Sequence, residues 1–283
     1  MSFLQWSLTS LLGPGSYVEV LKLLPLLAQR GAKDPAFHVI APSLPNYGFS
    51  SSPSKRGFAL AQYAETCHKL MLKLGYKEYV TQGGDWGFYI TRALGKLYPE
   101  NVKASHINMI RASPPKYTAN PIEALKHNWT SYTDTERAGL ARTEWFSKEG
   151  RGYFMEQSTK PQTLAYGLHD SPVALLAWIY EKLHDWTDSY AWTDDEIFTW
   201  ISIYAFSRAG PGAAHRMYYE VIHAKESQEG IHGRVVTRDD AEAYIPTVKL
   251  GLTHNPKELA VLPLSWGRTM GPVVYQVQND HGG

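Results

Sequence analysis

Residues 79–97 read YVTQGGDWGFYITRALGKL, and this stretch decides the fold class. Its first four residues are typical of a buried strand, and the apolar residues of 88–97 have helical spacing. Between them lies GGDWG, a small-x-nucleophile-x-small pattern with Asp85 at the position of the nucleophile. Such a sharp turn needs glycines, because side chains at the flanking positions would collide with the strand and the helix. The stretch therefore predicts a strand-turn-helix elbow that presents Asp85.

Asp85 has two interpretations. Aspartate is a good helix N-cap, so Gly-Gly-Asp can simply begin a helix. In an elbow, the positive amino end of the helix would favour the ionised carboxylate, and the backbone N–H of Trp86 would stabilise an oxyanion. A carboxylate that attacks a saturated carbon gives an ester that persists until water is activated. We therefore expect Asp85 to displace a group at carbon, either by opening an epoxide or by expelling a halide.

The segments around the elbow alternate between strand and helix patterns. Strand-like runs occur at 37–41, 79–82 and 102–109, and helical patterns occur at 61–75 and 86–97. This alternation is typical of βαβ units, in which helices connect the strands of a parallel sheet. The sequence therefore predicts the α/β class with a mostly parallel sheet.

The pattern changes between about residues 115 and 245, where helical segments rich in Trp and Tyr follow one another. Strand patterns return at 247–252 and 273–277. A sheet that is interrupted and then resumed indicates a core with an inserted helical cap over the carboxyl ends of the strands. The predicted division is core, cap and core, at residues 1–112, 113–245 and 246–283.

Composition excludes several classes of function. The 28 Lys and Arg residues against 27 Asp and Glu leave a net charge of +1, whereas nucleic-acid binding needs a clustered basic face. A single cysteine, Cys67, 11 scattered histidines and no glycine-rich phosphate loop predict neither a metal nor a cofactor. With no signal peptide or membrane span in the sequence, we expect a cytoplasmic protein. The 9 Trp, 18 Tyr and 9 Phe residues are typical of an aromatic core or an aromatic pocket for an apolar ligand.

Several separate segments, covering nearly all of the chain from Pro14 onward, resemble the epoxide hydrolases of the α/β-hydrolase fold, and the microsomal-type branch in particular. QGGDWG resembles the nucleophile motif of that family, and the glycine-proline loop, two cap segments, an acid motif and the approach to a histidine also have counterparts. These segments are QGGDWG at 82–87, PGSYVEVLKLLPLL at 14–27, RGY at 151–153, STKPQTLAYGLHDSPVALLAWIYEK at 158–182, YYEV at 218–221, NPKEL at 255–259 and VVYQVQNDHGG at 273–283.

The resemblance implies a two-step reaction on a small apolar epoxide. Asp85 would attack an epoxide carbon while two cap tyrosines, Tyr153 and Tyr218, donate hydrogen bonds to the oxirane oxygen. Tyr219 is the alternative to Tyr218 if the helix is shifted by one residue. A histidine held by an acid, here Glu258, would then activate water. The implied oxyanion donors are two backbone N–H groups, those of Trp86 and Gly13.

The chain departs from the family pattern in two places. Leu11–Pro14 stands where the family loop begins with His-Gly, and the strands before that loop are absent from the sequence. We expect a sheet that is incomplete at its N-terminal edge, which would favour a homo-oligomer. The family histidine follows the Gly-Gly of the last motif, where this chain ends at Gly283. His281 is the nearest histidine and the candidate base, so the chain has the pattern of a product truncated at both ends.

Three functions remain open. The first is an active epoxide hydrolase that forms vicinal diols in detoxification or secondary metabolism. The second is a catalytically impaired relative that binds such a ligand without turning it over. The third is a haloalkane dehalogenase, which also uses Asp followed by Trp. The two tyrosines argue against the third function, because halide loss needs no acid for an oxygen.

Overall fold

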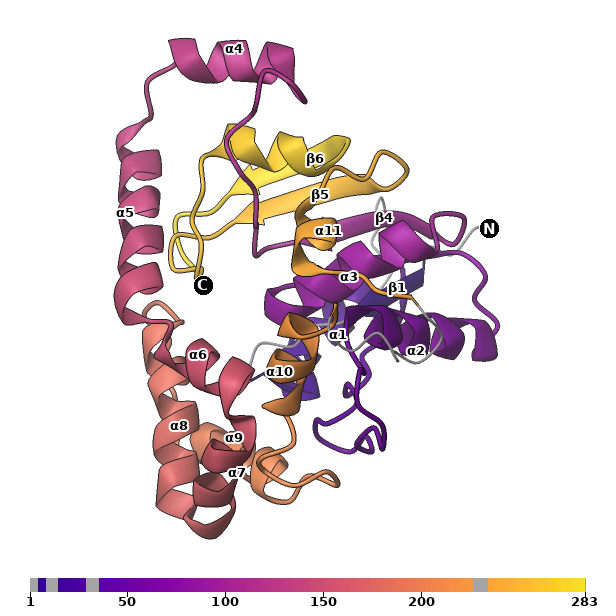
Figure 1. The fold of residues 1–283 in the computed structure, drawn as a ribbon, viewed down its shortest axis with the longest axis vertical. Coiled ribbons are helices and arrows are strands. Elements are labelled where there is room, and N and C mark those ends of the chain that lie inside the picture. Colours follow the sequence, from indigo (N-terminus) through magenta and orange to yellow (C-terminus); the bar gives the residue numbers. More distant parts are fainter. Residues whose placement is uncertain (1–4, 9–14, 29–35, 226–233, 283) are drawn as a thin grey trace.

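One parallel sheet forms the centre of the molecule (Figure 1). The structure is a computed structural model that describes residues 5–8, 15–28, 36–225 and 234–282. Its described strands have the order β2-β1-β3-β4-β5-β6, and all neighbouring pairs are parallel. The predicted α/β class with a mostly parallel sheet is confirmed. The strands are Gln5–Leu8 (β1), His38–Ile40 (β2), Tyr79–Gly83 (β3), Val102–Ile107 (β4), Lys249–His254 (β5) and Val273–Gln278 (β6).

The register of the sheet brings three chain segments to one edge. Gly83 at the end of β3 pairs with Ile107 at the end of β4, which in turn pairs with Leu252 of β5. Parallel strands place their carboxyl ends on the same side, so the segments that follow β3, β4 and β5 meet there. The core helices Leu60–Lys73 (α2) and Asp85–Leu97 (α3) pack against each other, and short helices occur at Tyr17–Val20 (η1), Leu24–Ala28 (α1) and Leu264–Met270 (η3).

Eight helices lie between β4 and β5 in the described part of the sequence. They are Pro121–Trp129 (α4), Asp134–Glu149 (α5), Gly152–Thr159 (α6), Pro161–Asp170 (α7), Pro172–Asp185 (α8), Asp194–Ala205 (α9), Arg216–Ile222 (α10) and Arg238–Glu242 (α11). Figure 1 shows α6 to α9 gathered beside the core, with α10 closer to the sheet. The division into three units at 112 and 245 stays a prediction. Across the described ranges, none of the helices is both long and apolar enough to cross a bilayer.

Helix α10 joins this helical region to the core. It buries Met217, Tyr218 and Val221 in the same apolar cluster as Trp86 of α3. On its other side it packs against α6. The aromatic and aliphatic residues of a short, largely buried helix therefore hold Tyr218 against the start of α3. The position of this tyrosine is fixed by packing on both sides.

Candidate active site

Strand β3 runs into α3 through a strained turn. Asp85 has a φ of +44°, a left-handed conformation that a residue other than glycine rarely adopts. A Cβ atom at Gly83 would lie 2.4 Å from the backbone of Gly87, and one at Gly84 would lie 2.7 Å from the side chain of Asn108. Gly83 therefore requires glycine, because the backbone blocks a Cβ there, whereas a Cβ at Gly84 would displace the end of a side chain. The strand-turn-helix expected from the sequence is present, and its strain is typical of a functional turn.

The turn directs Asp85 to the carboxyl edge of the sheet. Asp85 is the first residue of α3 and is 7% exposed. The backbone N–H of Trp86 donates a hydrogen bond of 2.7 Å to Oδ1 of the aspartate. The positive amino end of α3 adds to this stabilisation of the carboxylate. The predicted oxyanion donor on Trp86 is thus engaged by Asp85 itself in this structure.

Two tyrosines border the same cavity as Asp85. The cavity has a volume of about 70 Å³, and Asp85, Trp86, Tyr153 and Tyr218 line it. Tyr153 comes from α6 and Tyr218 from α10, and their rings lie 6.0 Å apart at 84°. The Tyr218 ring also packs edge-on against Trp86 at 4.8 Å. We name this space the nucleophile cavity. Tyr219, the alternative to Tyr218, is 38% exposed and stacks on His223 instead.

The environment keeps both phenols protonated. Burial raises the pKa of Tyr153 and of Tyr218, and the negative charge of Asp85 raises both further. Arg111 and Arg151 act in the opposite direction on the pKa of Tyr153. A neutral phenol can donate a hydrogen bond to an oxygen that gains negative charge. The pair is therefore suited to supply protons on the side of the cavity that faces the nucleophile.

Glu258 lies in the loop after β5 and is 3% exposed. Its Oε1 accepts a hydrogen bond of 2.8 Å from the backbone N–H of Leu259, and its Oε2 accepts one of 3.4 Å from Nδ2 of Asn108. Burial raises the pKa of Glu258 to about 7, and the charge of Asp85 adds to the rise. The Leu259 N–H and two cations, Arg111 and Arg142, partly offset it. Glu258 thus carries a proton for part of the time near neutral pH.

Two of the predicted site residues are not placed at the nucleophile cavity by the described part of the structure. Gly13 falls outside the described residues. His281 is exposed, and its Nδ1 forms a hydrogen bond of 2.5 Å with Asp280, which raises the pKa of the imidazole. Among the described residues that line the nucleophile cavity there is no histidine. The role of His281 as a base stays a prediction.

Three arginines at the nucleophile cavity were missed from the sequence. Arg111, Arg151 and Arg238 line it together with Asp85. Arg151 stands beside Tyr153 in the RGY segment, and Arg111 follows a strand whose carboxyl end was expected at the ligand site. From these two positions, the sequence could have predicted that arginines line the cavity around Asp85. Nothing in the sequence brings Arg238 to the same place.

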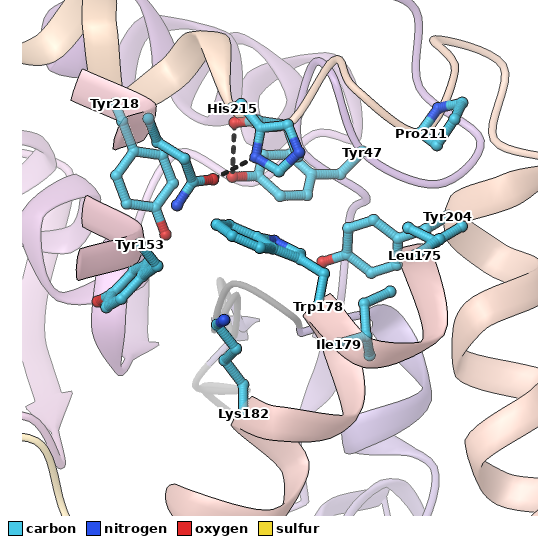
Figure 2. Close-up of a pocket in the computed structure, with 12 residues that line it drawn as sticks. Tyr47, Tyr153, Leu175, Trp178, Ile179, Lys182, Tyr204, Pro211, His215 and Tyr218 are labelled. Carbon is cyan, nitrogen blue, oxygen red and sulfur yellow. Dashed lines mark hydrogen bonds between the residues drawn. The ribbon is translucent and has the colours of Figure 1, made fainter. Parts of the chain in front are cut away.

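A second cavity shares Tyr153 and Tyr218 with the first (Figure 2). It has a volume of about 20 Å³, and we name it the cap cavity. His215 is 3% exposed, its Nδ1 contacts Oε1 of Gln157, and its ring meets Trp178 edge-on at 5.7 Å. Nζ of Lys182 lies 4.0 Å from the centre of the Trp178 ring. Within the described ranges, no group of three His, Cys, Asp or Glu residues is placed to hold a metal ion.

A family model described as alpha/beta hydrolase fold matches residues 13–225. The chain belongs to the α/β-hydrolase fold family. Curated proteins that are named epoxide hydrolases are similar to this chain over most of its length, which confirms the resemblance. "Epoxide hydrolase 1" of Oryctolagus cuniculus is 32% identical over 279 residues, which are 92% of this chain and 59% of that protein.

Solved structures of epoxide hydrolases have the same fold as this α/β hydrolase. The Aspergillus niger epoxide hydrolase is 32% identical with a TM-score of 0.80, and the match covers 99% of this chain and 66% of that one. The juvenile hormone epoxide hydrolase of Bombyx mori is 29% identical with a TM-score of 0.83, over 99% and 67% of the two chains. The chain spans 58% to 59% of the length of the first curated relatives that it matches.

Proposed function

We propose that this α/β hydrolase converts an epoxide to a vicinal diol through an ester on Asp85. The observation that supports it most strongly is the placement of a strained, buried carboxylate, the buried phenol of Tyr218 and the partly buried phenol of Tyr153 around one cavity. A carboxylate nucleophile alone is compatible with loss of a halide. Two phenols at the same cavity are useful when the leaving atom is an oxygen that must be protonated.

In the first step, one carboxylate oxygen of Asp85 attacks an epoxide carbon, and the bond between that carbon and the oxirane oxygen breaks. The oxygen takes the electron pair of that bond and accepts a proton from Tyr153 or Tyr218. The product is a hydroxyalkyl ester of Asp85. The helix amino end favours the charged nucleophile, and the raised pKa of the phenols keeps them protonated until the alkoxide forms.

In the second step, water adds to the carbonyl carbon of the ester and gives up a proton to a base. The backbone N–H groups of Trp86 and Gly13 are the proposed donors to the resulting oxyanion. When this intermediate collapses, its hydroxyl proton passes to the departing alkoxide, which leaves as the diol, and the Asp85 carboxylate is restored. The proton on the base then returns to the phenolate. Glu258 is the proposed acid that orients and charges the base, and His281 is the candidate base.

The test follows the ester and the diol separately. Purified protein is mixed with styrene oxide, and diol is measured by chromatography while the intact mass of the protein is recorded. We expect many equivalents of diol per protein molecule. The Asp85→Ala variant should show neither diol nor the mass increase of a covalent ester. In isotopically labelled water, a single turnover should place an oxygen of Asp85 in the diol and label the aspartate afterwards.

Other results separate the alternatives. A stoichiometric mass increase at Asp85 without diol indicates a catalytically impaired relative that stops after the first step. Halide release from a chloroalkane, with no reaction on styrene oxide, indicates a dehalogenase. If neither compound labels Asp85 or reacts, the proposed function is wrong. The Asp85→Ala variant needs an unchanged circular dichroism spectrum, so that loss of the fold does not explain its result.

A further inference from the structure

Cations outnumber anions on the wall of the nucleophile cavity. Arg111 follows β4, Arg151 is the N-cap of α6, and Arg238 is the first residue of α11, so the three come from separate segments. Asp85 is the only carboxylate among the described residues that line this cavity. A cavity built only for a neutral, apolar epoxide needs no such set of guanidinium groups.

The hydrogen bonds of these arginines are incomplete. Nη2 of Arg238 donates to the Tyr89 hydroxyl at 2.7 Å, and that hydroxyl donates to Glu242 at 3.1 Å. Among the described residues, the buried Nε atoms of Arg111 and Arg238 find no acceptor. None of the ion pairs found between described residues includes Arg111, Arg151 or Arg238. A buried charged donor without an acceptor costs free energy, which an anionic ligand would recover.

Two of the guanidinium groups are held in place by an aromatic ring. The Cζ atoms of Arg151 and Arg238 lie 5.1 Å and 5.2 Å from the centre of the Phe154 ring. Arg238 also lies 5.0 Å from the ring of Tyr89. Cation–π contact fixes the guanidinium planes before any ligand arrives, so less conformational entropy is lost on binding.

We propose that the substrate is an epoxide with a carboxylate attached to or next to the oxirane ring, and that Arg111, Arg151 and Arg238 bind this carboxylate. The inference rests on the proposed function. Guanidinium and carboxylate groups match in a planar, bidentate geometry. Without the arginines, the charge of Asp85 would repel such a substrate. With them, three positive charges face the two negative charges of nucleophile and substrate. The apolar epoxide expected from the sequence is the competing substrate class.

The test compares two epoxides of nearly the same shape, glycidate and glycidamide, which differ in charge. We expect kcat/KM for glycidate to exceed that for glycidamide by about tenfold or more, since a charge-assisted hydrogen bond is worth at least that factor. Arg111→Met should lower this ratio by about tenfold, and Arg111→Lys should restore part of it. Arg268→Met, at an exposed position on η3, is the matched control and should leave the ratio unchanged.

A binding measurement makes the result independent of turnover. Cyclopropanecarboxylate and cyclopropanecarboxamide have a ring of the same size without the reactive oxygen, and their binding is measured by calorimetry. The carboxylate should bind more tightly than the amide, less tightly in Arg111→Met, and more weakly as ionic strength rises. Melting temperatures of the variants show whether they fold.

The possible failures differ from one another. If glycidamide is hydrolysed as fast as glycidate and Arg111→Met leaves the ratio unchanged, the anionic substrate is wrong while the epoxide hydrolase function stands. If neither epoxide reacts and the carboxylate still binds through Arg111, the anion site stands and the proposed function is wrong. Equal binding of the acid and the amide by the unmodified protein overturns the inference whatever the rates are.

Discussion

The nucleophile cavity and the cap cavity share Tyr153 and Tyr218, but their other walls differ in chemistry. The first has Asp85 and three arginines, and the second has aliphatic and aromatic side chains around a buried histidine and lysine. Figure 2 shows the two tyrosines beside Trp178 and Lys182 in the cap cavity. On the side of the cap cavity the two phenols have mainly aromatic and aliphatic neighbours and one cation, Lys182. On the side of the nucleophile cavity they face one carboxylate and three guanidinium groups. Burial keeps both phenols protonated. In the proposed reaction they would donate a proton to the oxirane oxygen on the side of the nucleophile cavity.

The two environments also treat ionisable groups differently. In the cap cavity, burial and the charge of Lys182 lower the pKa of His215 to about 4, so this histidine is neutral at pH 7. Beside the nucleophile cavity, burial raises the pKa of Glu258 to about 7, but Arg111 and Arg142 prevent a larger rise. Burial thus favours the neutral form of both groups, and the nearby charges decide how far each pKa moves.

The largest expected effect comes from removing both phenols. A Tyr153→Phe and Tyr218→Phe double variant should open epoxides roughly 100 to 10,000 times more slowly, because the alkoxide would then form without a proton donor. The rate of ester formation on Asp85, followed by rapid quenching and mass spectrometry, measures this step. Tyr219→Phe, at the neighbouring and partly exposed position, is the control and should keep the original rate. An unchanged rate in the double variant would reduce the shared tyrosines to packing residues.

A smaller effect is expected at Glu258, and it concerns stability. The folded pKa of about 7 lies above the ordinary value of 4.5, so folding binds a proton between these pH values and the free energy of unfolding falls as pH rises through them. At about 1.4 kcal/mol per pH unit, the loss above pH 7 is about 3 kcal/mol. Glu258→Gln cannot ionise and should be more stable than the unmodified protein by about this amount at alkaline pH.

Urea unfolding at several pH values measures this difference. The gain from Glu258→Gln should disappear below the ordinary pKa of a glutamate, where both proteins carry a neutral side chain. Glu149→Gln, at the exposed end of α5, is the matched control and should show no such pH-dependent gain in stability. A constant difference at every pH would mean that packing or hydrogen bonding, and not ionisation, distinguishes the amide from the acid. The contrast between the two cavities would then lose its electrostatic basis.

The parts of the site that could be predicted are those with a local physical cause. Gly83 is required by a close contact with Gly87 in the same turn. The pentapeptide GGDWG also fits a simple helix N-cap, and the strand pattern before it and the helix pattern after it favoured the elbow. Tyr153 and Tyr218 were identified through family resemblance, because 18 tyrosines offer no pattern that selects two of them. Helix α10 places Tyr218 through buried neighbours that are distant in sequence.

The basic wall of the nucleophile cavity lay beyond sequence reasoning for a related reason. Its three arginines lie in the loop after β4, directly before α6 and at the start of α11. They come together only because the helical region packs on the core, and the sequence pattern of each segment does not predict that packing. The burial of Glu258 was missed as well, since NPKEL has the composition of an exposed loop. Long-range packing decides both features.

The smallest expected effect is at Lys182 in the cap cavity. Its side chain is 2% exposed, and its Nζ lies 2.7 Å from Oε1 of Glu181, which is itself 63% exposed. Burial lowers the pKa of the lysine, which shows that the charge is costly there, although Glu181 and the Trp178 ring compensate part of the cost. Because Glu181 is exposed to solvent, removal of the lysine charge leaves no buried charge without a partner, and replacement of a buried charge by a well-packed apolar side chain is often neutral or stabilising.

Lys182→Met keeps the length of the stem and removes the charge, so we expect the free energy of unfolding to change by no more than about 1 kcal/mol. Removal of the positive charge should also raise the pKa of His215, measured by nuclear magnetic resonance of the imidazole, because Lys182 contributes to its low value. Lys148→Met, in an exposed pair with Glu144, provides the comparison for a surface lysine. A loss of several kcal/mol in Lys182→Met would mean that the cap cavity depends on its charge as much as the nucleophile cavity does. The charge of Lys182 would then stabilise the cap cavity, on the aromatic side of Tyr153 and Tyr218.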